Sequence, residues 1–325
     1  METLRLSQCH TNGHDNMGLM HAVRVTVLAL ALTVPVSFAE PPSQDTLKVS
    51  VDLVNVQFSV TDRRGRFIPG LGMKDFIVEE DGKRQEIQHF ARENVLPLTM
   101  AMLIDTSPSV RPVFDEEKMT ATSFLESILR PNDLALVMGF DRSVTLVQDY
   151  TESTRRLKAA INELEIGGGT SLYDAVWLAC REKLGGEAGR KAIILISDGE
   201  DTTSKTKFFE ALVAAHQSDA VIYSISNSSG GFFFGRGRAR GGDPGTLRKL
   251  SDETGGSMFM LTNQNSFKRI FEQIAQELRS QYSLGYVSTN TAKDGKFREI
   301  RIIPRDSSYT VKARKGYYAA KNPDR

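Results

Sequence analysis

One stretch constrains the fold of this chain more than any other, the run LTMAMLI over residues 98–104. Such a run, of strand length and with little polar alternation, is typical of a strand covered on both faces, as in the middle of a parallel sheet. It ends abruptly in the sequence DTSPS, which puts Asp105, Ser107 and Ser109 at alternate positions of the following loop. In open α/β sheets, ligands bind beyond the carboxyl ends of the strands, so we expect this loop to carry function.

The spacing Asp-x-Ser-x-Ser suits a small cation. Oxygen ligands at every second residue of a turning loop can converge on one ion, and magnesium takes six oxygens while keeping several waters. Two hydroxyls and one carboxylate neutralise such an ion only in part, so a complete site needs oxygens from elsewhere in the chain. The competing interpretation is that Asp105 or Ser107 merely caps the helix that follows.

Two later loops favour the metal site. Residues 165–175 (EIGGGTSLYDA) form a glycine-rich turn that opens a helix, with Thr170 at the turn. Residues 192–197 (AIILIS) are a second buried-strand run, and Asp198 follows it directly. Two apolar strands therefore end in an aspartate, and a Gly-Gly-Gly-Thr loop lies between them.

In this order, the three motifs DTSPS (105–109), GGGTSLYDA (167–175) and ISDGEDT (196–202) resemble the von Willebrand factor A domain, the fold of integrin inserted domains. The resemblance covers roughly residues 96 to 285. It implies a metal-ion-dependent adhesion site that holds Mg²⁺ or Mn²⁺. By the same resemblance, Ser107 and Ser109 bind the metal directly, Thr170 binds directly or through water, and Asp105 and Asp198 act mostly through bound waters.

The chemistry agrees with that division of roles. Carboxylates that stay behind waters leave the metal with net positive charge and an open position, which attracts an acidic group of a partner protein. The resemblance therefore implies a protein-binding module, not an enzyme, whose partner supplies an aspartate or glutamate. Pro108 stands where many family members have glycine, and because proline fixes φ near −65°, we expect a loop of restricted movement.

The sequence predicts helices over residues 113–129, 151–164, 205–217, 244–254 and 264–280, and one from the Thr170 loop to Leu184; the first begins near the acidic Asp115-Glu116-Glu117. Strands are expected over residues 134–140, 144–147, 192–197, 220–226 and 257–261, and residues 76–90 are expected to form a hairpin on the Asp81-Gly82 turn. This alternation over residues 96–280 predicts an α/β fold with a doubly wound, mostly parallel sheet and helices on both faces. Residues 46–95 and 281–319 contain only short strand patterns, and neither segment is long enough to bury a core alone. We expect them to pair in one small β-sandwich-like domain made from both chain ends, with the α/β domain inserted. These β segments also resemble a bacterial exported group of von Willebrand-related proteins.

The N-terminus reads as a targeting segment. Residues 25–36 (VTVLALALTVPV) form an apolar core after Arg24, and Ser37-Phe38-Ala39 offers a small-x-small cleavage site, which predicts a signal peptide over residues 1–39. The apolar core falls short of the roughly 20 residues that span a bilayer. We therefore expect a secreted or periplasmic mature chain without a membrane span, and we interpret Met17 as the true start.

Composition and motif content argue against several classes of function. The formal net charge of +1 argues against bulk attraction to nucleic acid or to an anionic membrane. Removal of the signal peptide takes Cys9 away and leaves Cys180, so no intrachain disulfide is possible, and its apolar neighbours predict a small core residue. The chain has no His-Glu-x-x-His and no Gly-x-Ser-x-Gly motif.

Two other functions stay open at this point. Asp105 beside magnesium could be the nucleophile of a phosphoryl hydrolase, although serine at position 107 leaves no general acid there. Alternatively, the protein is a structural component of the cell envelope, in which the metal only stiffens the loops. The segment 228–242 (SSGGFFFGRGRARGG) is either a flexible loop or an arm for anionic ligands, and we favour the loop. No pattern in the sequence indicates which protein is the partner or what the oligomeric state is.

Overall fold

The computed structural model describes residues 53–92, 96–227 and 242–321 of the 325-residue chain. The expected signal peptide and residues 228–241 of the Gly/Arg/Phe loop lie outside the described residues.

A six-stranded sheet forms the centre of the α/β part, in the order β10-β9-β8-β5-β6-β7. Its strands are β5 (Leu98–Asp105), β6 (Leu134–Phe140), β7 (Val144–Thr151), β8 (Arg190–Ser197), β9 (Val221–Ser226) and β10 (Met258–Met260). Every neighbouring pair is parallel except β6 and β7. The chain builds β6 and β7 on one side of β5 and β8 to β10 on the other, so the topological switch point lies between β5 and β8.

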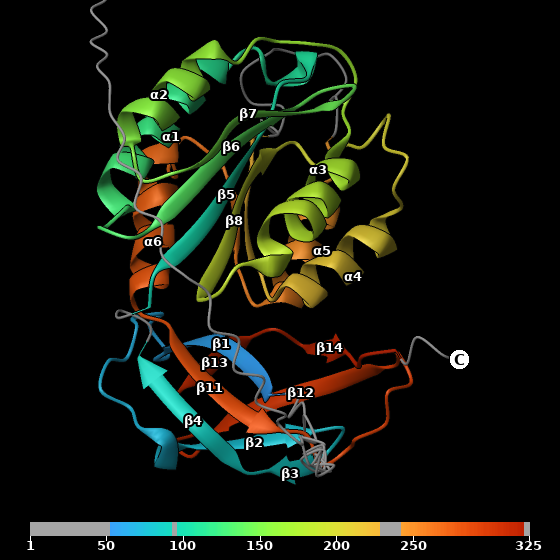
Figure 1. The fold of residues 1–325 in the computed structure, drawn as a ribbon. Helices are drawn as coiled ribbons and strands as arrows, with labels where there is room; N and C mark the ends of the chain where they lie inside the picture. The colour runs from blue at the N-terminus through green and yellow to red at the C-terminus, as the bar shows by residue number, and fades with distance from the viewer. Residues whose placement is uncertain (1–52, 93–95, 228–241, 322–325) are drawn as a thin grey trace, which may run out of the picture. The chain divides into compact units, whose positions relative to one another are not determined.

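Helices cover both faces of this sheet (Figure 1). One face packs against α1 (Phe114–Ile128), α2 (Thr154–Glu163) and α6 (Phe267–Arg279), and the other against α3 (Leu172–Leu178), α4 (Phe208–Ser218) and α5 (Pro244–Thr254). All residues of β5 are buried: Met100, Met102 and Ile104 join the core on the first face, while Ala101 and Leu103 join the core on the second. The fold class predicted from the sequence is confirmed.

Local sequence signals place the helix ends. The Asp243 carboxylate accepts hydrogen bonds from the backbone N–H groups of Gly245 (3.0 Å) and Thr246 (3.3 Å) and so caps α5, which has Pro244 in its first turn. Gly255 ends this helix with a φ of +83°, a conformation that favours glycine.

Two elements differ from the sequence expectation. The helix after the Thr170 loop, expected to reach Leu184, turns at Ala179 into a π segment (Ala179–Lys183), which a 3₁₀ turn (Leu184–Gly186) follows. Strand β7 runs to Thr151 instead of ending at Val147. Its second half is polar, because an edge strand exposes one side, and a hydrophobic pattern does not detect it.

Strands from both ends of the chain form two further sheets, β13-β1-β11-β4 and β14-β12-β2-β3. They are β1 (Leu53–Thr61), β2 (Phe76–Glu80), β3 (Lys83–Gln85), β4 (Ile87–Arg92), β11 (Tyr282–Val287), β12 (Phe297–Pro304), β13 (Thr310–Ala313) and β14 (Gly316–Tyr318), with a 3₁₀ turn (Met73–Asp75) before β2. Strand β1 is antiparallel to β11 and β13, and β12 is antiparallel to β2. An aromatic core joins the sheets, with the rings of Phe58 and Phe76 at 5.0 Å between centroids.

The hairpin over residues 76–90 is more complex than its sequence predicts. An Asp81-Gly82 turn does connect β2 to β3, but the return strand breaks at Glu86. The chain then enters the other sheet as β4, which pairs with β11. The final strand, β14, was not expected from the sequence.

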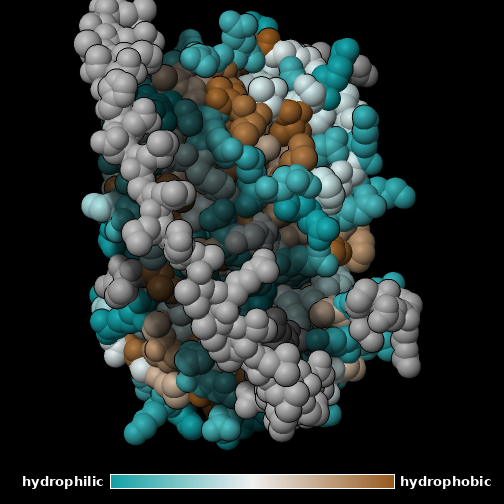
Figure 2. Space-filling model, in the orientation of Figure 1, coloured by the Kyte–Doolittle hydropathy of each residue, from teal (hydrophilic) through white to brown (hydrophobic). Residues whose placement is uncertain are grey.

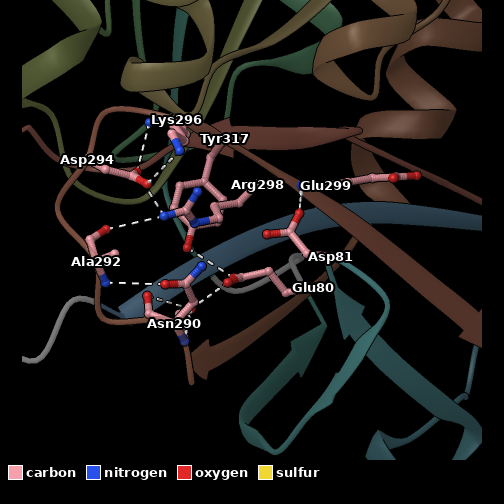
Figure 3. Close-up of polar contacts among 10 residues, drawn as sticks. Glu80, Asp81, Asn290, Ala292, Asp294, Lys296, Arg298, Glu299 and Tyr317 are labelled. Atoms are coloured by element: carbon pink, nitrogen blue, oxygen red, sulfur yellow. Dashed lines mark hydrogen bonds and ion pairs between the residues drawn. The ribbon is translucent and has the colours of Figure 1, made fainter.

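A buried carboxylate links the two sheets from within, and Figure 3 shows it beside Tyr317. Glu80, at the end of β2, is 1% exposed and accepts hydrogen bonds from the hydroxyls of Tyr286 (2.8 Å), Ser288 and Tyr317 (3.0 Å). Tyr286 belongs to β11 and Tyr317 to β14, so one carboxylate holds strands of both sheets together. Such a buried charge is tolerated because several donors satisfy it.

Polar residues dominate the face drawn in Figure 2, and a hydrophobic area lies over the edge strand β7, where Leu146 is 38% exposed. Within the described part of the chain, no helix is both long enough and apolar enough to cross a membrane.

Candidate functional site

The switch point between β5 and β8 brings two of the sequence motifs to one place. The two strands pair in parallel from Leu98 opposite Arg190 to Ile104 opposite Ile196, so their carboxyl ends lie side by side. Asp105 ends β5 and Ser197 ends β8, and the Ser197 hydroxyl donates a 2.6 Å hydrogen bond to Asp105 Oδ2.

Asp105 is fully buried, and it organises its own loop. Its Oδ1 accepts a 2.8 Å hydrogen bond from the backbone N–H of Ser107. Burial raises the pKa of Asp105 to about 6, against the lowering effect of hydrogen bonds from Ser197 and Ser107, and the charge of Asp198 adds to the rise. With both oxygens bound, the carboxylate is suited to position the loop.

The hydroxyls of Ser107 and Ser109 are hydrogen-bonded to each other, with their oxygens 2.8 Å apart. Ser107 is 2% exposed and precedes a 3₁₀ turn (Pro108–Val110), which turns the loop so that Ser109 comes back beside it. In an octahedral magnesium site with ligands at 2.0–2.1 Å, adjacent oxygens lie about 2.9 Å apart. The hydroxyl pair therefore fits two neighbouring positions around such an ion.

The Thr170 loop is bonded to both other loops. Its Gly167 N–H donates to Thr106 O (2.8 Å), beside Asp105. The backbone N–H of Thr170 donates to the Thr202 hydroxyl (2.8 Å), and Thr170 O accepts from the N–H groups of Thr202 (2.9 Å) and Thr203 (3.0 Å). Gly169 has a φ of +80°, which a side chain would strain, so glycine is required just before Thr170.

Asp198 lies in the third loop and is 7% exposed. Its Oδ1 accepts a hydrogen bond from Glu200 N–H (3.0 Å), and it is close enough to Asp105 for its charge to raise the pKa of that group. The next residue, Gly199, has a φ of +86°, and a Cβ there would lie 2.2 Å from Asp243 O.

The five predicted metal residues thus fall in three loops that hydrogen bonds join at one edge of the sheet. Direct contacts link Asp105, Ser107 and Ser109, the charge of Asp198 reaches Asp105, and the backbone of Thr170 is tied to the loop after Asp198. Among the described residues, no three or more His, Cys, Asp or Glu side chains form a metal-binding group. A cation here would depend on hydroxyl oxygens, an all-oxygen set that suits Mg²⁺ or Mn²⁺.

Sequence reasoning missed a buried polar pair near Asp105. Glu117 of α1 is fully buried, and its Oε2 accepts a 3.2 Å hydrogen bond from Asn227 Nδ2 at the end of β9. Burial raises the pKa of Glu117 well above its usual range, and the charge of Asp105 adds to the rise. We had assigned Glu117 to an acidic helix start. Its i+3 spacing from Phe114 and i+4 spacing to Ala121, both buried, is the signal that places it inward.

Comparison with known proteins supports the fold of the α/β part. The profile of the von Willebrand factor type A domain matches residues 100–200. No protein among those with curated descriptions matches the chain.

Solved structures with a similar fold include the conserved hypothetical protein BatB from Bacteroides thetaiotaomicron (TM-score 0.45, 18% identity, 56% of this chain and 97% of that chain). Others are the vWF domain of the pilus tip protein Mfa5 from Porphyromonas gingivalis (0.41, 14%, 56% and 94%) and the mussel byssus protein PTMP1 with a zinc-occupied MIDAS motif (0.47, 17%, 60% and 48%). The profile match shows that residues 100–200 of this chain carry a von Willebrand factor type A domain, and the doubly wound sheet is consistent with that match.

Proposed function

We propose that the protein is an exported, adhesion-type binding module that recognises a carboxylate of a partner protein through Mg²⁺ or Mn²⁺. The ion is held by Ser107, Ser109 and Thr170, with Asp105 and Asp198 acting through bound waters. The observation that carries the proposal is the pair of serine hydroxyls at 2.8 Å, on a loop that the buried carboxylate of Asp105 fixes.

The charged and the neutral residues of the proposed site have different roles. Asp105 accepts from Ser107 N–H and from the Ser197 hydroxyl, which holds the loop of β5 against the end of β8. Ser107 and Ser109 then offer neutral oxygens, which do not cancel the charge of a cation. When bound, the cation supplies a positive centre with an open position for an anionic oxygen of the partner.

The burial of Asp105 opposes the hydrolase alternative. A nucleophilic carboxylate must reach the substrate, whereas this side chain is fully buried and both of its oxygens accept hydrogen bonds. We therefore assign it a positioning role. Export rests on the apolar segment and cleavage site of residues 25–39.

The first test measures the metal alone. Titration of the purified mature chain with MnCl₂ and with MgCl₂ is expected to show one saturable site. Ser107→Ala is expected to weaken it by about tenfold or more, since each lost contact to a charged group is worth about 1.5–3 kcal/mol. Ser123→Ala is the matched control, because that hydroxyl donates only to Met119 O of its own helix.

The second test separates adhesion from a structural role. Wild-type, Ser107→Ala and Ser123→Ala chains are used to capture proteins from the host's envelope extract, with and without EDTA. A partner held by wild type and Ser123→Ala, and lost with EDTA or Ser107→Ala, supports adhesion. Metal binding without a metal-dependent partner would favour the structural role. Phosphatase activity that Asp105→Asn abolishes would restore the hydrolase.

A further inference from the structure

A cavity of about 190 Å³ lies at the amino ends of β8 and β9. It lies at the opposite end of β8 from the metal loops. The 8 residues of that strand are joined by seven steps of about 3.3 Å, so the two sites lie roughly 23 Å apart. Its walls include Lys191 of β8, His216 near the end of α4, and Arg314 between β13 and β14. The cavity therefore belongs to neither the metal loops nor the sheet core.

Lys191 is a buried cation without a partner. The residue is 9% exposed and forms no hydrogen bond or ion pair with any residue in the described ranges, and its Nζ is not among the fully buried atoms without a partner, so water in the cavity reaches it. It stands two residues before Ile193, so its side chain leaves the strand on the face that α3, α4 and α5 cover. Burial lowers the pKa of Lys191, although Asp219 and Glu187 exert an opposing, raising effect. Nearby carboxylates are thus present, but none pairs with the ammonium.

Two further side chains bring unused polar atoms to the same cavity. The Arg314 guanidinium donates to the Asp219 carboxylate and to Asn55 O (2.6 Å), yet its Nε finds no partner among the described residues. His216 is 3% exposed, and its Nδ1 is likewise unpartnered within the described part of the chain. The unpaired Nε–H of Arg314 is a buried donor, which is costly and points to a missing acceptor.

We propose that this cavity binds a small oxyanion, a carboxylate or phosphate group, with Lys191 as its main charged contact. The Nε–H of Arg314 supplies a neighbouring contact. A volume of about 190 Å³ is enough for a small acid. Of the two carboxylates that line the cavity, Asp219 is already paired with Arg314, and Glu187 lies at the partly exposed rim.

A purely structural explanation accounts for Arg314 but not for Lys191. Cations stabilise helix C-termini, and Arg314 does so by donating to His216 O in the last turn of α4 (3.4 Å). Lys191 makes no such bond to α4 or to α5. It is therefore the cation of the cavity that no protein group engages, and the residue whose replacement tests the proposal.

The experiment titrates the mature chain with sodium succinate and with sodium phosphate at constant ionic strength, following heat release and thermal unfolding. We expect one of these probes to bind saturably and to raise the unfolding temperature. Lys191→Met should weaken that binding by about tenfold or more, because an ion-assisted contact is lost. Lys158→Met, which removes the same charge from an exposed position of α2, should bind as wild type.

Further arms distinguish the outcomes. Succinate binding alone identifies a carboxylate ligand, and phosphate binding alone identifies a phosphate ligand. Without probe, Lys191→Met should unfold at a higher temperature than wild type, because an unpaired buried charge is removed. If that variant misfolds, Lys191→Ala is used with the ¹H–¹⁵N signals of the His216 ring in wild type as a second readout. Ser107→Ala should leave oxyanion binding unchanged, because the metal loops lie at the other end of β8. The oxyanion proposal is therefore tested independently of the metal site. No saturable binding of either probe, or equal binding by the lysine variants, would overturn it.

Discussion

Burial of His216 predicts a measurable dependence of stability on pH. The side chain is 3% exposed, and burial, assisted by the charge of Arg314, lowers its pKa from 6.5 to about 4. In the unfolded chain the imidazole regains its ordinary pKa. As the pH falls below 6.5, the imidazole therefore becomes protonated in the unfolded state but stays neutral in the folded state. The free energy of unfolding decreases until the pH reaches about 4.

The size of this effect follows from the same values. Between pH 7.5 and pH 5, the unfolded imidazole titrates over about 1.5 pH units while the folded one stays neutral, and each unit is worth about 1.36 kcal/mol. The contribution of His216 to the free energy of unfolding should therefore fall by about 2 kcal/mol. His216→Gln removes the titrating group, so its stability should fall by about 2 kcal/mol less than that of wild type over the same interval.

Urea unfolding at the two pH values, followed by circular dichroism, measures the difference directly. Other titrating groups act on both proteins and cancel in the comparison. His89→Gln is the matched control, because the His89 ring of β4 is exposed. Equal losses of stability in wild type and His216→Gln would refute the reasoning, and so would a loss of pH dependence in His89→Gln.

Three further predictions concern buried positions. Glu80→Ala should lower the free energy of unfolding by about 3 kcal/mol or more in urea titrations, because the buried hydroxyl of Tyr286 and the half-buried hydroxyls of Ser288 and Tyr317 lose their shared acceptor; an effect below 1 kcal/mol would contradict the linking role of Glu80. Gly256→Ala should lower the yield of folded protein and the unfolding temperature, since a Cβ would lie 2.0 Å from Ile222 O, whereas Gly186→Ala, with open space around it, should not. Burial raises the pKa of the Cys180 thiol to about 12, so iodoacetamide should label it only after denaturation, and rapid labelling of the native chain at pH 8 would show that the thiol is accessible.

The sequence predicted those parts of the fold that depend on residues close together in the chain. Residues 98–104 and 192–197 are apolar without alternation, and both are central strands of the sheet. The polar residues that follow them, Asp105 and Asp198, lie at one edge because parallel strands bring their carboxyl ends together. Helix α5 was predicted at its observed bounds because proline, an aspartate cap and a terminal glycine mark both ends.

The parts that were missed depend on partners distant in sequence. At Glu86 the chain leaves β3 and enters the other sheet as β4, and no residue type near Glu86 indicates that change. Glu117 looks like an exposed helix-start acid until α1 packs against the sheet beside Asp105. The cavity around Lys191 is built from segments that include Asn55 and Arg314, which lie far apart in the chain. Tertiary packing alone brings these groups together.

Crystallography of the mature chain with MnCl₂, using anomalous scattering from manganese, tests the central claim most directly. The account predicts one manganese ion bound by the hydroxyl oxygens of Ser107 and Ser109, with Asp105 and Asp198 nearby and one position of the ion open to solvent. An ion held elsewhere, or no anomalous peak at these hydroxyls at saturating manganese, would contradict it.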